Sequence, residues 1–227
     1  MKKVLIIGAN SDIGQACAEE FLKKSHQVTL AAHHPEKIKI ENCKTLLFDV
    51  QTSALDSLGN DYDIVLYIAG KMYDNEATLF GEEKKSVMEV NYNAPVRILS
   101  YFAEVFEKKG GGTIAGVTSV AAVRGKSSTV VYGSAKAGFD NFLGGLRSFV
   151  YPTVRVVSFR LGYVDTKMTA EMDLPGLLTS SKANAAKTIV KNCLKGNRNI
   201  VYVKSVWRPI SFIIKNIPEF IFKRLKI

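Results

Sequence analysis

The chain has 227 residues, of which 47% are hydrophobic and 23% are charged. This length and composition are typical of one folded α/β domain and exclude a disordered or repeat-built chain. The formal net charge is +10, and residues 204–227 hold six Lys or Arg against one Glu, a net of +5. Because half of the excess charge lies there, we expect a local basic patch and no nucleic-acid-binding body.

The cysteines and histidines do not form a metal-binding pattern. The three cysteines are Cys17, Cys43 and Cys193. They lack metal-type spacing, and His33 and His34 have no partner ligands nearby in the sequence. We therefore expect reduced thiols, no metal and a cytoplasmic protein. We also expect no secretory signal, because residues 1–3 lead directly into a strand-like run.

Apolar runs alternate with helical patterns as far as residue 205. The strand-like runs are residues 4–7, 28–32, 46–50, 64–68, 113–117, 154–159 and 200–203. The helical patterns are residues 12–24, 82–108, 131–149 and 181–194. This alternation predicts an α/β Rossmann fold, in which a doubly wound, parallel seven-stranded sheet has helices on both faces. Residues 1–205 are expected to form this single domain.

A glycine-rich turn joins the first predicted strand to the first predicted helix. Its candidate binding residues are Gly8, Asn10, Ser11, Asp12, Ile13 and Gly14. Free backbone N–H groups and the positive end of the helix dipole suit such a turn to the pyrophosphate of a dinucleotide. Because it lies inside a βαβ unit of about thirty residues, the turn predicts a cofactor site.

The second predicted strand ends without the usual determinant of cofactor choice. An acid at this point would hold the ribose hydroxyls, and an arginine nearby would favour an extra phosphate. The sequence has Ala32, His33 and His34 instead. His33 either lies beside the adenosine ribose or is an ordinary loop residue, so NAD(H) and NADP(H) both stay open.

Four polar residues form a candidate catalytic set. Tyr132 and Lys136 are four residues apart and so share one face of a predicted helix. A lysine cation nearby would lower a tyrosine pKa from ~10 and make the phenol a general acid/base. Lys136 could also bind the nicotinamide ribose. Ser119, which follows the fifth strand, could donate to the substrate oxygen. Asn91, within a predicted helix, could hold a water for proton relay to Lys136.

The ordered set resembles the short-chain dehydrogenase/reductase superfamily. The residues that carry the resemblance are the glycine-rich turn, Asp49, Ala69, Gly70, Asn91, Ser119, Tyr132 and Lys136. The resemblance implies an NAD(P)-dependent oxidoreductase that moves hydride between a nicotinamide and a carbonyl or alcohol. It also implies that Asp49 and Val50 border the adenine. Ala69 and Gly70 would line the cofactor cleft, and Thr166 would touch the nicotinamide carboxamide.

Three positions depart from the superfamily pattern. Asp12 replaces the usual middle glycine of the turn, where an aspartate could cap the first helical turn. Tyr67 and Ile68 replace the usual pair of asparagines, so a stabilising hydrogen bond is missing. Leu161 replaces the usual proline before Gly162, which loosens the loop over the nicotinamide. None of these changes removes a proton-transfer group.

Two segments bear on the substrate. Residues 167–182 are predicted to be a largely apolar lid. Its apolar residues are Met168, Met172, Leu174, Leu177 and Leu178. Residues 206–227 form an amphipathic basic tail, which Pro209 and Pro218 divide into short pieces. The apolar stretches of the tail are shorter than the roughly 20 residues that span a bilayer. The tail either lies in a membrane interface or packs on the body or on a second subunit.

The tail and the catalytic helix resemble one branch of the superfamily. The runs that carry this resemblance are residues 132–140, the pair Asn91 and Tyr92, and residues 216–225. The branch includes the reductase subunit of decaprenylphosphoryl-ribose epimerase, which also has an acid at the position of Asp12. Its members reduce a keto-sugar attached to a polyprenyl phosphate, beside a flavin oxidase. The resemblance implies cell-envelope polysaccharide synthesis at the inner face of the membrane.

Two other functions stay open from the sequence. One is a soluble reductase of a small or acyl-carrier-linked ketone, with a tail that supports a homo-oligomer. The other is a cofactor-sensing protein without turnover, although such a sensor has no need of the intact set Ser119, Tyr132, Lys136 and Asn91.

Overall fold

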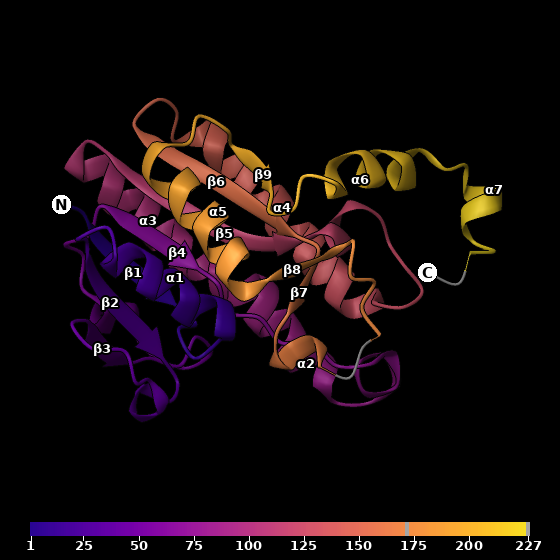
Figure 1. The fold of residues 1–227 in the computed structure, drawn as a ribbon, viewed down its shortest axis with the longest axis horizontal. Helices are drawn as coiled ribbons and strands as arrows, with labels where there is room; N and C mark the ends of the chain where they lie inside the picture. The colour runs from indigo at the N-terminus through magenta and orange to yellow at the C-terminus, as the bar shows by residue number, and fades with distance from the viewer. Residues whose placement is uncertain (171–172, 226–227) are drawn as a thin grey trace.

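The computed structural model describes residues 1–170 and 173–225, and seven of its strands form one parallel sheet (Figure 1). The strand order is β3-β2-β1-β4-β5-β6-β9. These strands are β1 (Lys3–Ile7), β2 (Gln27–Ala32), β3 (Lys44–Leu47), β4 (Ile64–Tyr67), β5 (Gly112–Ser119), β6 (Val154–Leu161) and β9 (Ile200–Tyr202). The chain reverses its direction of winding between β1 and β4, which confirms the doubly wound Rossmann sheet.

Helices cover both faces of this sheet. On one face lie α1 (Asp12–Leu22) and α5 (Lys182–Lys195), and on the other lie α3 (Ala94–Lys109) and α4 (Val130–Phe149). Successive side chains of a strand point to opposite faces. In β1, accordingly, Ile6 packs in the core under α1 and α5, whereas Leu5 and Ile7 pack under α3 and α4.

The predicted helix over residues 82–108 is not continuous. It consists of α2 (Glu83–Met88), a π-helical turn over Glu89–Asn93, and α3. Pro95, the second residue of α3, has no N–H to donate to the carbonyl of Asn91, and the widened turn lies just before it. A second π-helical turn, Glu76–Phe80, precedes α2. The interruption places Asn91 in the interior of the protein.

Part of the predicted lid is strand. A small parallel sheet pairs β7 (Tyr163–Asp165) with β8 (Thr179–Ser181). Two side chains that follow β9 hold the lid: Trp207 Nε1 donates to Leu178 O at 3.0 Å, and Lys204 Nζ donates to Thr179 O at 2.7 Å. Met172, which the sequence assigns to the lid, lies outside the described residues.

The C-terminal segment forms two short helices that project from the domain beside the 3-10 turn Val120–Val123, which precedes α4 (Figure 1). These are α6 (Trp207–Asn216) and α7 (Glu219–Phe222). Pro218 separates them as predicted, but the expectation for Pro209 is wrong. It is the third residue of α6, where a backbone N–H would have no intrahelical partner, so proline is tolerated. Within residues 1–170 and 173–225, no helix has the length and apolar character needed to cross a membrane.

Candidate cofactor and catalytic site

The glycine-rich turn brings the ends of β1 and β4 into close contact. Gly8 has a φ of +91°, and a Cβ placed on it would lie 2.4 Å from Ala69 N, so no other residue fits. Ser11 caps α1: its Oγ accepts from Gly14 N at 3.1 Å and donates to Gly8 O at 2.9 Å. Ile13 packs against the core. The N-terminus of α1 therefore stands at the switch point of the sheet, and this backbone cradle fits a pyrophosphate.

Asp12 joins this turn to the lid. Its Oδ2 accepts a hydrogen bond from Lys167 N at 2.9 Å, and its Oδ1 lies 3.9 Å from Lys182 Nζ. The expectation that Asp12 caps the helix is wrong, because Ser11 has that role. Lys167 and Lys182 are the first and last residues of the predicted lid. One carboxylate therefore binds both ends of the lid to the nucleotide turn.

The end of β2 is tied to the same turn. Asn10 Nδ2 donates to His34 O at 2.7 Å, and Asn10 Oδ1 accepts from His34 N at 2.9 Å. The neighbouring His33 has its Nδ1 3.4 Å from the carboxylate of Asp49. Val50, which follows Asp49, accepts a hydrogen bond from Arg97 through its carbonyl. The structure thus brings together His33 and Asp49, the two side chains that the sequence places beside the adenosine.

Asn91 and Lys136 converge on Gly70, at the end of β4. A Cβ on Gly70 would lie 3.4 Å from Asn91 Oδ1 and 3.6 Å from Lys136 Nζ. Asn91 is fully buried and its Nδ2 donates to Val87 O at 2.9 Å and to Lys71 O at 2.6 Å. Lys136 Nζ donates to Val117 O at 3.1 Å. Burial lowers the pKa of Lys136 to about 7, so this ammonium loses its proton easily.

Tyr132 and Ser119 lie together beside this pair. Burial raises the pKa of Tyr132 to about 12, and a hydrogen bond with the Ser119 side chain opposes the shift. The expectation that Lys136 lowers the tyrosine pKa is therefore wrong. Lys136 Nζ is 5.9 Å from the centroid of the Tyr132 ring, and burial has made the lysine itself only partly charged at neutral pH. Tyr132 keeps its proton at pH 7 and is suited to donate it.

The lid approaches the same cleft. Met168 Cε lies 3.9 Å from the position of a Cβ on Gly70. Thr166, which precedes the lid, is hydrogen-bonded to its first turn: the Thr166 N–H donates to Thr169 Oγ1 at 3.3 Å. The loop after β6 is fixed by a contact that no motif signalled: a Cβ on Gly162 would lie 1.8 Å from Trp207 Nε1. A buried tryptophan thus stands against the loop in which Leu161 replaces the usual proline.

Two residues near the site escaped the sequence analysis. From the sequence, Trp207 is expected in the tail, whereas it packs against the loop at Gly162. The one feature that could have predicted this position is that a lone tryptophan follows the last strand. Lys71 was missed because it uses its backbone N–H and C=O to hold the amide of Asn91. No group of three or more His, Cys, Asp or Glu in the described parts of the chain is placed to hold a metal ion.

Comparisons with known proteins identify relatives of the chain. The sequence profile of the short chain dehydrogenase family matches residues 2–175. An uncharacterised oxidoreductase of Mycobacterium tuberculosis is 30% identical over 141 residues, which are 62% of this chain. The matched part of this chain spans only 56% of that relative's length. An uncharacterised oxidoreductase of Streptomyces coelicolor is 29% identical over 245 residues, covering 99% of this chain and 96% of that protein.

A crystal structure of a short-chain dehydrogenase from Burkholderia cenocepacia, in complex with NADP, has the same fold. It superposes with a TM-score of 0.82 at 20% identity, covering 99% of this chain and 97% of that one. At this identity the likeness concerns the fold alone. The family profile covers most of the chain, including the glycine-rich turn, Ser119, Tyr132 and Lys136. The chain belongs to the short-chain dehydrogenase family.

Proposed function

We propose that the protein is an NAD(P)-dependent oxidoreductase that interconverts a carbonyl and an alcohol. The observation that carries this proposal is that Asn91 and Lys136 converge on Gly70 at the carboxyl edge of the sheet. The Tyr132 ring, 5.9 Å from Lys136 Nζ, has its hydroxyl hydrogen-bonded to Ser119. The nicotinamide, when bound, supplies or accepts the hydride. Either NAD(H) or NADP(H) is compatible with His33 and Asp49 at the adenosine end, and calorimetric titration with each will decide.

The chain's own groups would hold the cofactor along one edge. The turn over residues 8–14 and the N-terminus of α1 receive the pyrophosphate, and Ala69 and Gly70 line the cleft. Thr166 lies just before the lid and is available to the carboxamide. Lys136 is available to the nicotinamide ribose.

Proton transfer is the task of the phenol of Tyr132, a half-buried residue. Tyr132 is protonated at neutral pH, so it gives its proton to the substrate oxygen as negative charge develops there in the reductive direction. Ser119 donates a hydrogen bond to the same oxygen. Asn91 Oδ1 and Lys136 Nζ both lie close to Gly70. Asn91 would there hold the water that relays protons to Lys136.

The test of this mechanism is Tyr132→Phe, which removes the hydroxyl and keeps the ring. We expect turnover to fall by about 10²–10⁴-fold, the usual contribution of a general acid. Cofactor affinity, measured by titration calorimetry, should change little. A matched control is Tyr92→Phe, a tyrosine of the π-helical turn that is not assigned to catalysis. Retained turnover in Tyr132→Phe would show that another group supplies the proton.

For the substrate, we infer a keto-sugar carried on a polyprenyl phosphate, in cell-envelope polysaccharide synthesis at the inner face of the membrane. A flavin oxidase would act beside this protein as its partner. Support comes from α6 and α7, which expose Phe212 and Phe220 and contact the segment after Ser119 through Arg124. Oxidation of NADPH and NADH should be measured against free and polyprenyl-linked keto-sugars. Faster turnover of the free sugars would contradict the inference.

A second candidate is a soluble reductase of a small or acyl-carrier-linked ketone that acts as a homo-oligomer. The observation that favours it is a second exposed apolar site, Phe149 and Tyr151 at the end of α4, which are 84% and 80% exposed. Exposed apolar residues that lie together mark interaction surfaces, of which a subunit interface is one kind. Analytical ultracentrifugation of the full chain, with Phe149→Ser as the variant, separates this candidate from the first.

A further inference from the structure

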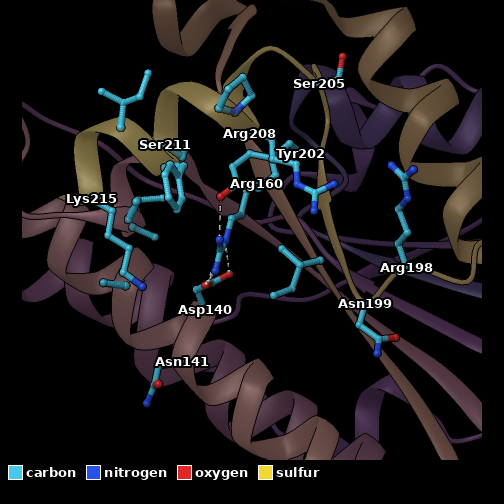
Figure 2. A pocket seen from close by; sticks show the side chains of 17 residues that line it. Asp140, Asn141, Arg160, Arg198, Asn199, Tyr202, Ser205, Arg208, Ser211 and Lys215 are labelled. Carbon is cyan, nitrogen blue, oxygen red and sulfur yellow. Dashed lines mark hydrogen bonds and ion pairs between the residues drawn. The ribbon is translucent and has the colours of Figure 1, made fainter. Parts of the chain in front are cut away.

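A cleft of about 1120 Å³ lies between α4, the edge strand β9 and α6 (Figure 2). Its charged lining residues are Asp140, Arg160, Arg198, Arg208 and Lys215. Asp140 is the one acid among the described lining residues, and its Oδ2 accepts from Arg160 Nη2 at 2.6 Å. Figure 2 shows this pair at the centre of the cleft. Three cations, those of Arg198, Arg208 and Lys215, remain in excess.

Apolar side chains of α6 border the same cations. Trp207 and Ser211, four residues apart, are buried and fix the inner face of α6. Phe212 and Ile213 line the cleft, yet they are 71% and 61% exposed. In α7, Phe220 is 62% exposed. Large apolar groups that face solvent beside cations mark an interaction surface.

Arg124 fixes the orientation of this surface. Its guanidinium donates to the carbonyls of Ile214, at 3.0 Å, and of Ile217, and it pairs with Glu219 at 2.6 Å. The same group lies 3.7 Å from the centroid of the Phe222 ring. Because Arg124 follows the catalytic strand β5 by five residues in sequence, α6 and α7 are attached to the active domain with a defined outer face.

We infer that this cleft and the outer face of α6 and α7 dock on an anionic lipid bilayer. Phosphodiester headgroups would pair with Arg198, Arg208 and Lys215, while Phe212 and Ile213 enter the membrane interface. A second copy of the chain fits less well, since a two-fold interface would place this basic surface against itself. The inference rests on the proposed lipid-linked substrate for its role, but it is tested without substrate or cofactor.

The first test measures co-sedimentation of the full chain with phosphatidylcholine vesicles that contain 30%, or no, phosphatidylglycerol. We expect binding only to the anionic vesicles. The variant R198Q/R208Q/K215Q should bind about a hundredfold more weakly, from about fivefold for each cation near the surface. Its matched control is K23Q/K187Q/K191Q, which removes the exposed charge of Lys23, just after α1, and those of Lys187 and Lys191 in α5. If both variants lose vesicle binding equally, binding depends on net charge alone and the inference is overturned.

The second test separates docking from its rivals. F212S/I213S should weaken vesicle binding at least tenfold and leave the circular dichroism spectrum unchanged. The inference is overturned if the chain stays in solution with anionic vesicles. It is also overturned if F212S/I213S dissociates a dimer, or if a single-stranded oligonucleotide binds more tightly than the vesicles. Tyr132→Phe should dock normally without turnover, so failure of the proposed reaction and failure of docking give different results.

Discussion

At the scale of single residues, Tyr132 and Lys136 show opposite pKa shifts with a common cause. Burial penalises whichever form is charged, so it raises the tyrosine pKa to about 12 and lowers the lysine pKa to about 7. At physiological pH the phenol of Tyr132 is therefore neutral, and the amine of Lys136 is about half protonated. A proton can leave Lys136 and return to it without a large change in free energy.

The shifted lysine makes a prediction about stability. Its folded pKa of about 7 lies below the unfolded value of 10.5. Between these two values the unfolded chain binds more protons, so this group makes the free energy of unfolding rise with pH, by up to about 1.4 kcal/mol per pH unit. Lys136→Met should lack this rise. Urea unfolding of both proteins between pH 7 and pH 10 measures the difference. If the free energy of unfolding has the same pH dependence in both, the lowered pKa of Lys136 is contradicted.

At the scale of elements, the lid is held from two sides. Asp12 binds both of its ends, while Trp207 and Lys204 bind its carbonyls near β8. A hydrogen bond to a charged group contributes about 1.5–3 kcal/mol. Loss of the bond between Lys167 N and Asp12 should therefore raise the population of an open lid more than tenfold.

Asp12→Ala tests this hold on the lid. The variant should be cleaved by trypsin after Lys167, a site that all three proteins share, about tenfold faster than the natural chain. Lys182→Gln provides the comparison, because it removes only the 3.9 Å ion pair with an exposed lysine and should have a much smaller effect. Mass spectrometry of the fragments over time gives both rates. If the rates for Asp12→Ala and the natural chain are the same, the carboxylate does not control the lid.

The elements show why sequence predicts some features and not others. Buried parallel strands are apolar on both faces, so β1 and β4 are evident as short continuous runs. The polar end of β5 at Thr118 and Ser119 interrupts its run, and the predicted strand is therefore too short. The polar strand β8 has no apolar pattern at all.

The candidate site divides in a similar way. Tyr132 and Lys136 could be predicted because their spacing has meaning on a helix, and Ser119 follows a recognisable strand. The contact between Asp12 and Lys167 spans 155 residues of sequence and has no local pattern. Its existence depends on how the lid folds back over the turn, which only the three-dimensional structure determines.

At the scale of the whole molecule, five segments distant in sequence meet at the carboxyl edge of one sheet. They are the turn after β1, the ends of β2, β4 and β5, and the lid after β7. Parallel strands all direct their carboxyl ends to the same edge, so loops from different parts of the chain assemble one site there. The helices α6 and α7 are a separate addition that is attached near this edge through Arg124.

Removal of that attachment should release α6 and α7 without unfolding the domain. Arg124→Met keeps the apolar stem and leaves two carbonyls without their donor, which costs about 1–3 kcal/mol. We expect hydrogen exchange in residues 207–225 to accelerate about tenfold, with exchange in β4 and β5 unchanged. Glu219→Gln removes only a salt bridge to a 76% exposed carboxylate and should have little effect. Equal exchange in Arg124→Met and the natural chain would contradict this role.

Trp207 is the one tryptophan of the sequence, and its position gives the protein a built-in optical probe. The indole is buried, donates to Leu178 O, and lies edge-on to Tyr163 with 5.3 Å between ring centroids. Its emission wavelength therefore depends on whether the lid is closed or solvent has reached the ring. Lid motion can be followed in real time on the unlabelled, unmodified chain, and each spectral change can be assigned to a single chromophore.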